Sequence, residues 1–341
     1  MKKIKHSLVA FGQGLKDCIG ILVGLLVMCV LVMILTPKFL TTSNLFNIGR
    51  QICINIFLSC GMTLVILLGG IDLSVGSIIA VTGCVSAGMI TWMKLPVPVG
   101  ILIGIASGTL IGVFNGLIIS RTTIPPFIVT LATMNIGRGF ARIYTQAKTI
   151  AVLDPRYTFF GTGKVAGIPV QLFFIVIVVL ITSFILNKTK LGRQTFYVGD
   201  NEQAARYAGI KVEHIRFFGF FFSGLLAAMA GILSTARTFA ATMDMGQSAE
   251  MDAVAAVVLG GTSMSGGRGS LMGTVIGAII IGVLNNGMNL LGINTSWQYV
   301  VQGVVILIAV FVDYLKNQGS SINLAKLFGA KKEMEKPKRG K

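Results

Sequence analysis

Two polar residues interrupt a long apolar stretch near the start of the chain. Asp72 and Ser74 follow the pair Gly69-Gly70 and precede Gly76, and apolar runs extend on both sides. Their carboxylate and hydroxyl groups can hydrogen-bond a polar solute, but a charge at membrane depth is costly and normally faces protein or water. Paired glycines weaken a helix, and Asp or Ser suits the start of a new one. The stretch therefore predicts that one membrane helix ends and another begins inside the protein.

A second glycine-rich stretch, residues 258–270, repeats this pattern in the other half of the chain. Two interrupted hydrophobic segments at corresponding places in two halves are typical of the substrate path of a transporter. The alternative is a pair of ordinary loops between short spans, with Asp72 capping the helix that follows it. On the first interpretation the path contains Asp72, Ser74, Gly260, Gly261 and Ser265, with Asn115 and Thr130 as weaker candidates.

The composition predicts an all-α polytopic membrane protein. Of the 341 residues, 54% are hydrophobic and only 12% are charged, and the mean hydropathy is +0.82. Soluble domains average roughly 25% charged residues. The apolar runs are continuous, whereas the strands of a membrane barrel would alternate. The net charge of +17 fits cytoplasmic loops and tails better than a nucleic-acid partner, which we do not expect.

About ten membrane segments are expected, because roughly 20 helical residues cross the hydrocarbon core. The segment 251–261 is too short to cross alone and should be a half-helix. The segment 127–144 is doubtful, because Arg138 and Arg142 lie near its end. The full set of expected spans is 18–35, 52–69, 74–92, 97–119, 127–144, 169–186, 217–236, 251–261, 271–290 and 298–315.

Basic segments predict the orientation of these spans. Lysine and arginine gather in the N-terminal segment 1–17, in the loop 187–216 and in the tail 316–341, all of which should be cytoplasmic. The membrane domain then covers 18–315, with the connection 145–168 outside. Counting crossings makes the repeats 52–144 and 217–315 inverted relative to each other.

No pattern indicates catalysis, a cofactor or a metal site. The chain lacks a Gly-x-Ser-x-Gly elbow, a zinc signature and the Gly-x-x-x-x-Gly-Lys-[Ser/Thr] loop that cradles ATP phosphates. Its five cysteines form no Cys-x-x-Cys pair and lie mostly in apolar runs, so small buried apolar residues are expected rather than disulfides.

The cytoplasmic loop predicts a helix that docks on a partner. Asp200 or Asn201 can cap a short helix, Ala204 and Ala205 leave a low-profile face, and Gly209 can end it. The alternative is a solvated basic loop that touches lipid headgroups. The expected docking residues are Gly199, Asp200, Asn201, Glu202, Ala204, Ala205 and Gly209.

Several motifs in order make the chain resemble a known family. They are Gly70–Gly76 (GIDLSVG), Phe114-Asn115-Gly116, Pro126–Leu131 (PFIVTL), Thr189–Arg193 (TKLGR), the run from Glu250 to Gly261, and Ser265-Gly266-Gly267-x-Gly269. Over about residues 20–315 the chain is similar to the membrane permeases of bacterial binding-protein-dependent ABC sugar importers of the ribose/xylose/galactose group. Residues 199–210 resemble the loop of such permeases that docks on the ATPase, with Glu-Gln-Ala-Ala in place of Glu-Ala-Ala.

The resemblance implies three kinds of partner in the bacterial cytoplasmic membrane. These are ATP-binding subunits inside, a periplasmic or lipid-anchored sugar-binding protein outside, and a second permease copy as a homodimer or heterodimer. The missing phosphate loop agrees, since energy must come from another chain. A branched-chain amino acid ABC permease is the nearest alternative. A secondary transporter would need more intramembrane ionisable groups than Asp72, and a channel would need a ring of charges or carbonyl groups.

Overall fold

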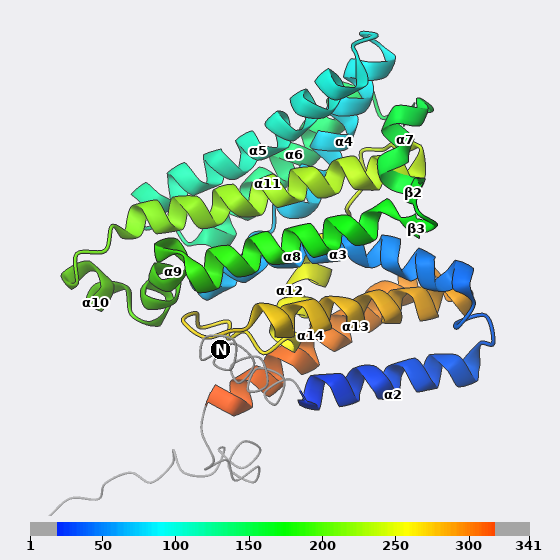
Figure 1. Cartoon of the computed structure of the whole chain (residues 1–341). Helices are drawn as coiled ribbons and strands as arrows, with labels where there is room; N and C mark the ends of the chain where they lie inside the picture. Colours follow the sequence, from blue (N-terminus) through cyan, green and yellow to red (C-terminus); the bar gives the residue numbers. More distant parts are fainter. Residues whose placement is uncertain (1–18, 318–341) are drawn as a thin grey trace, which may run out of the picture.

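The computed structural model describes residues 19–317 and consists almost entirely of helices (Figure 1). The expected segment 1–17 and nearly all of the tail 316–341 lie outside the described residues. The helices are α2 (Ile19–Leu35), α3 (Thr42–Leu67), α4 (Val75–Thr91), α5 (Val97–Arg121), α6 (Pro126–Thr145), α7 (Pro155–Thr162), α8 (Val170–Lys188), α9 (Lys190–Asp200), α10 (Glu202–Tyr207), α11 (Val212–Thr238), α12 (Ala249–Leu259), α13 (Leu271–Leu290) and α14 (Thr295–Asn317).

Each of the ten expected spans coincides with a helix, which confirms the all-α polytopic class. Within the described residues, five helices are long and apolar enough to cross a membrane: α3, α5, α8, α11 and α13. Shorter apolar helices lie in α2, α4 and α14. Helix α12 has 11 residues, as expected for a half-helix. Helix α6 is continuous through Arg138 and Arg142.

Helix α3 begins at Thr42, well before the expected start at residue 52. The side chain of Thr41 accepts a hydrogen bond from the Asn44 amide and so caps the helix. The first turns carry Asn44, Asn47 and Arg50, whose polarity hides this part of the helix from a hydropathy window. The expected span was therefore too short at its N-terminal end.

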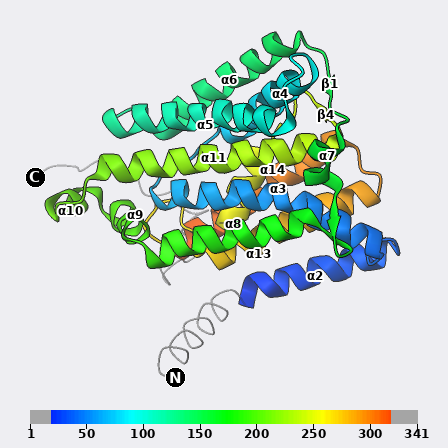
Figure 2. The ribbon, with the colours of Figure 1, turned by 45° about the horizontal axis from the view of Figure 1, so that its top comes forward.

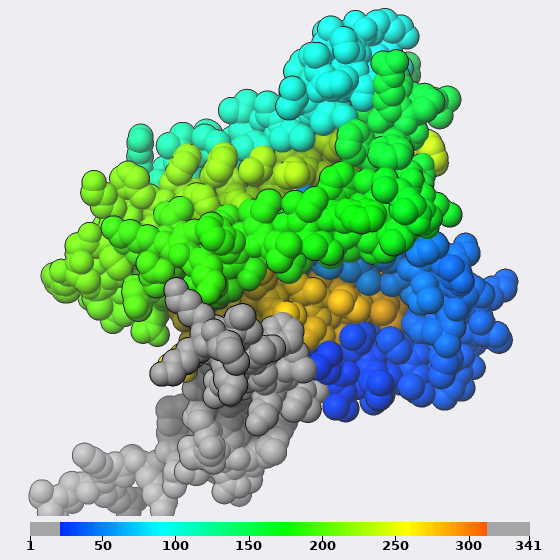
Figure 3. Space-filling view, in the orientation of Figure 1, coloured from blue at the N-terminus to red at the C-terminus, as the bar shows by residue number. Residues whose placement is uncertain are grey.

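The centre of the bundle is formed by α3, α4, α11, α12 and α13, whose buried apolar side chains make one core. Helix α11 packs along α3, α4 and α5. A Cβ on Gly112 of α5 would lie 2.8 Å from the Cα of Gly224 of α11, so glycine at both positions lets the two backbones touch. The yellow-green and green atoms of α11 and α8 run side by side across one face (Figure 3).

Short strands and small helices lie at the two ends of the bundle. Strands β1 (Ile150–Ala151) and β4 (Ala240–Ala241) pair antiparallel, and β2 (Lys164–Val165) pairs with β3 (Ile168–Pro169). These strands and α7 lie at one end, and α9 and α10 lie at the other (Figures 1 and 2). The expected outer connection and the expected cytoplasmic loop are thus on opposite sides.

Candidate functional site

The first break in the apolar helices is a buried turn between α3 and α4. Helix α3 ends at Leu67, and Gly69 then adopts a φ of +73°, which favours glycine. The chain passes through Asp72 and starts α4 at Val75, with Ser74 as its N-cap. Asp72 and Ser74 are both fully buried. The turn is therefore held inside protein, as the sequence pattern predicts.

Asp72 is the centre of a polar cluster that joins this turn to α11. One carboxyl oxygen accepts hydrogen bonds from the amide and the hydroxyl of Ser74, at 3.0 and 2.6 Å. The other oxygen accepts from the hydroxyl of Ser223 on α11, at 2.8 Å. Buried carboxyl groups need such partners, because desolvation without them is costly. Asp72 therefore fixes the turn to a helix far away in the sequence.

Two further sequence candidates join the same cluster. The side-chain amide of Asn115 on α5 donates to the Ser74 hydroxyl at 2.9 Å, and Thr130 on α6 donates to the carbonyl oxygen of Ile71 at 3.1 Å. Both side chains are buried. The structure thus brings together Asp72, Ser74, Asn115 and Thr130, but in the interior of one chain rather than on a surface that a solute can reach.

The second break lies between α12 and α13 and contacts the first. Gly260 packs against the backbone of Gly273, and Gly261 and Gly267 have φ values of +83° and +71°. The amide of Gly267 donates to the carbonyl oxygen of Leu67 at 2.9 Å. A Cβ on Gly69 would lie 3.7 Å from the carbonyl oxygen of Ser265, whose side chain is exposed. The two interrupted segments are therefore neighbours in space.

The expected docking loop folds into α9 and α10. The Asn201 side chain caps α10 by accepting from the Ala204 amide at 2.9 Å, and Gly209 ends it with a φ of +76°. Glu202 forms ion pairs with Arg206 at 3.0 Å and with Arg216 of α11 at 2.5 Å. These contacts join the short helix to the start of α11.

Gly199 and Asp200 lie where this loop meets the two breaks. A Cβ on Gly199 would overlap the carbonyl oxygen of Leu67, and a Cβ on Gly267 would lie 2.6 Å from the Cα of Asp200. No side chain therefore separates the loop from either break. The backbone of the loop 187–216 is in direct contact with both interrupted segments.

The two alanines of α10 have different environments. Ala204 is exposed, but Ala205 is only 4% exposed and packs in a small apolar cluster with Leu68, Val198 and Ile215. The methyl group of Ala205 is thus occupied by contacts within the chain. The side chain that projects furthest from α10 is Tyr207, which is 91% exposed. The outward face of α10 is therefore centred on Ala204 and Tyr207.

A polar strip runs along α6, the helix that covers the doubtful span 127–144. Asn135, Arg138 and Arg142 are spaced three and four residues apart and so share one face of the helix. Arg138 donates to the carbonyl oxygens of Met243 and Met245, at 3.1 and 2.6 Å.

A cavity of about 170 Å³ opens beside this strip. Its lining includes Arg138, Arg142 and Asp244. Arg142 and Asp244 lie 4.0 Å apart with side chains 65% and 61% exposed. The charged groups around this cavity are therefore accessible on the surface of one chain.

A family model described as the branched-chain amino acid transport system permease component matches residues 44–310. This range contains both breaks, the docking loop and the polar strip. The chain belongs to this family. The permease is also similar to curated proteins along most of its length. The ribose import permease of Bacillus subtilis is 46% identical over 307 residues, which are 89% of this chain and 95% of that protein.

Further relatives are also named as sugar permeases. The ribose import permease of Escherichia coli K12 is 42% identical, over 86% of this chain and 93% of its own. The galactose/methyl galactoside import permease of the same strain is 36% identical, over 87% and 94%. No solved structure matches the permease.

Sequence reasoning missed two parts of the permease. Ser223 is the first hydroxyl residue in the apolar run 217–236, which also contains Ser234 and Thr235, so the sequence alone does not single it out. The strip on α6 was visible as two arginines spaced four residues apart. Their charge counts against a span, although a charged side chain in an apolar segment is itself an indication of function.

Proposed function

We propose that the chain is the permease subunit of an ATP-driven importer in the bacterial cytoplasmic membrane, with a monosaccharide of the ribose type as its cargo. The observation that carries the proposal is the 46% identity to a ribose import permease across nearly the whole of both chains. The relatives named for allose and galactose support a sugar rather than an amino acid as the cargo, although the family description names amino acids.

The ATPase is a separate cytoplasmic subunit that docks on α10 through Ala204 and Tyr207. The helix is polar on its outer face, and its loop links α8 to α11. A cavity of about 370 Å³ beside it, lined by Lys190, Gln194 and Lys211 among others, gives a second surface for that subunit. A sugar-binding protein delivers cargo at the opposite end, where α7 and the short strands lie.

The translocation path follows the polar strip of α6 and faces a second permease copy. Asn135, Arg142 and Asp244 are exposed on or just beside α6, and exposed charged side chains next to apolar helices favour contact with protein or water over lipid. Guanidinium and carboxylate groups hydrogen-bond sugar hydroxyls. The buried cluster around Asp72 then holds the helices beside the path in position and does not line the path itself.

Uptake measurements test the proposal. The chain is expressed with its cognate ATPase and binding protein in a strain that lacks its own pentose and hexose importers. Radiolabelled ribose should accumulate in an ATP-dependent way, and an excess of unlabelled leucine should not compete. Accumulation of leucine but of no sugar, or uptake that survives inactivation of the ATPase, would contradict it.

A further inference from the structure

The outer end of the bundle contains two arginines that have no counter-ion. Arg50 lies on α3 and Arg237 in the last turn of α11. The two helices run antiparallel, because Leu68 packs with Val212 and Gly61 lies against Ser223, and this register brings both arginines to the same end of the bundle. The Nε atom of Arg50 is buried without a hydrogen-bond partner. Within residues 19–317 neither side chain forms an ion pair. Two positive charges at the same end of two packed helices, without a carboxylate partner, favour the binding of an anion there.

An unpartnered acceptor lies on the neighbouring helix α8. Gln171, in the first turn of α8, is buried and donates through Nε2 to the carbonyl oxygen of Phe160 at 2.7 Å. Its Oε1 atom is buried without a partner. The Cys53 thiol donates to the carbonyl oxygen of Gln171 at 3.4 Å and is also within electrostatic range of Arg237. Helices α3 and α8 therefore each bury one unsatisfied polar atom close to the contact between Cys53 and Gln171.

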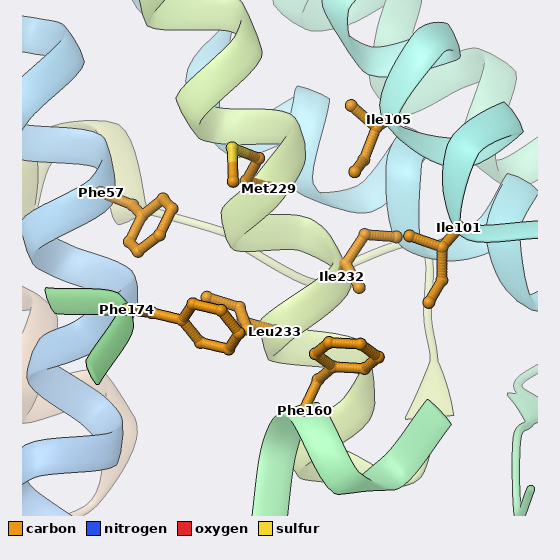
Figure 4. Close-up of a pocket in the computed structure, with 8 residues that line it drawn as sticks. All are labelled: Phe57, Ile101, Ile105, Phe160, Phe174, Met229, Ile232 and Leu233. Carbon is orange, nitrogen blue, oxygen red and sulfur yellow. The ribbon is translucent and has the colours of Figure 1, made fainter. Parts of the chain in front are cut away.

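An apolar cavity of about 120 Å³ is lined by side chains of the same three helices, α3, α8 and α11, together with α5 and α7 (Figure 4). Phe57 of α3, Phe174 of α8 and Leu233 of α11 point into the same space in that view. The full lining is Phe57, Ile101, Ile105, Phe160, Phe174, Met229, Ile232 and Leu233. No charged group contributes to this wall, so it suits a hydrocarbon chain.

The polar groups and the cavity share the same helix faces. Phe57 is seven residues after Arg50, and Leu233 is four residues before Arg237, so each pair lies on one side of its helix. Phe174 follows Gln171 by three residues in the same way. The expected topology places the three polar residues toward the outside and the cavity toward the hydrocarbon core.

The cavity also lies between two helices that face lipid. Leu102 of α5 and Val176 of α8 are exposed apolar residues next to the lining residues Ile101 and Phe174. A lipid tail can therefore reach the cavity from the bilayer without crossing a polar surface.

We propose that this place is a binding site for an anionic phospholipid of the outer leaflet, with its phosphate between Arg50 and Arg237 and part of one acyl chain in the cavity. Gln171 then accepts a hydrogen bond from a headgroup hydroxyl such as those of phosphatidylglycerol. The lipid would hold α3, α8 and α11 together at their outer ends.

Native mass spectrometry of the delipidated full-length chain tests this proposal. The protein is offered equal amounts of dioleoyl phosphatidylglycerol and dioleoyl phosphatidylethanolamine. We expect preferential retention of phosphatidylglycerol, reduced about fivefold for each of Arg50→Gln and Arg237→Gln, since one basic residue contributes roughly this much to anionic-lipid affinity. Arg156→Gln, an exposed arginine at the same end, is the matched control and should retain the lipid.

Two more variants separate a lipid site from a phosphate site and from misfolding. Met229→Trp fills the cavity and should lower retention of the lipid, whereas the double Arg→Lys variant keeps both charges and should keep the preference. Equal retention of phosphatidylglycerol by the wild type and by the double Arg→Gln variant overturns the proposal. Displacement by inorganic phosphate together with full retention by Met229→Trp also overturns it, because the acyl chain would then have no role.

Discussion

The amide nitrogen of Gly267 donates a 2.9 Å hydrogen bond to the carbonyl oxygen of Leu67, and this bond joins the two interrupted segments of the chain. Leu67 is the last residue of α3, and Gly267 lies in the loop that precedes α13. The backbone at Gly199 and Asp200 packs on the same two residues. A movement of the loop 187–216 therefore reaches both segments through backbone contacts alone.

Replacing Gly199 with Ala should uncouple this junction. The new methyl group would overlap the Leu67 carbonyl, and overpacking of this kind costs about 1–3 kcal/mol. We expect normal membrane insertion and a loss of most sugar uptake, measured with the labelled substrate. Gly303→Ala is the control, since open space surrounds that glycine. Wild-type uptake by Gly199→Ala would show that these backbone contacts do not pass movement of the loop to the two interrupted segments.

Asp72 should prove to be structural rather than a ligand for cargo. Ser223→Ala removes one hydrogen bond to a carboxyl group, which is worth about 1.5–3 kcal/mol if the group is charged, so thermal stability should fall. Asp72→Asn keeps one acceptor and should transport with an unchanged KM, because the side chain is fully buried. A KM for uptake that rises in Asp72→Asn, at unchanged stability, would place the carboxyl group in the path.

Substitutions in the polar strip on α6 should lower sugar uptake without lowering the stability of the protein. Arg142→Gln and Asp244→Asn alter exposed side chains, so the melting temperature of the purified protein should stay near that of the wild type. Sugar uptake should fall through a changed KM or maximal rate. Lys148→Gln, an exposed cation just beyond the end of α6, is the matched control. Unimpaired uptake in both strip variants would rule out this face as the path.

Two substitutions in α10 should have different consequences. Tyr207→Ala removes the most exposed side chain of this helix and should weaken co-purification of the ATPase while the permease stays intact. Ala205→Glu places a carboxylate in the cluster of Leu68, Val198 and Ile215, so it should destabilise the loop itself. If Tyr207→Ala retains the ATPase at wild-type strength, docking occurs elsewhere.

Cysteine labelling checks the orientation. A cysteine at Lys190 of α9 should be unreactive to a membrane-impermeant maleimide in spheroplasts, and one at Arg156 of α7 should react. Native Cys53, Cys60 and Cys84 are buried and should give little background. Labelling at Lys190 but not at Arg156 would reverse the topology.

The sequence predicted the elements better than their contacts. Apolar runs predicted the helices, because burial in lipid needs continuous hydrophobic length. The first turns of α3 are polar, so the same criterion did not include them in the predicted span. The cap at Asn201 and the turn at Gly209 were predictable, since both follow from local chemistry. The burial of Ala205 was not, because it depends on where α9 and α11 pack.

The buried cluster around Asp72 shows the same limit of prediction from sequence. Asp72 and Ser74 stood out in the sequence as polar residues among apolar ones, yet the sequence could not tell a path-lining carboxyl group from one that is fixed by Ser223. That distinction depends on the packing of α11 against α4. The inverted relation between the repeats 52–144 and 217–315 stays a prediction.

The contact between Gly112 and Gly224 restricts how this bundle can change shape. Where two helix backbones touch, there are no side-chain rotamers to absorb a displacement, so α5 and α11 should travel as one rigid body through the transport cycle. Helix α4, buried against both, should travel with them. Alternating access would then be a rocking of this unit against α12, α13 and α14, with the glycine turns at residues 69 and 267 as its hinges.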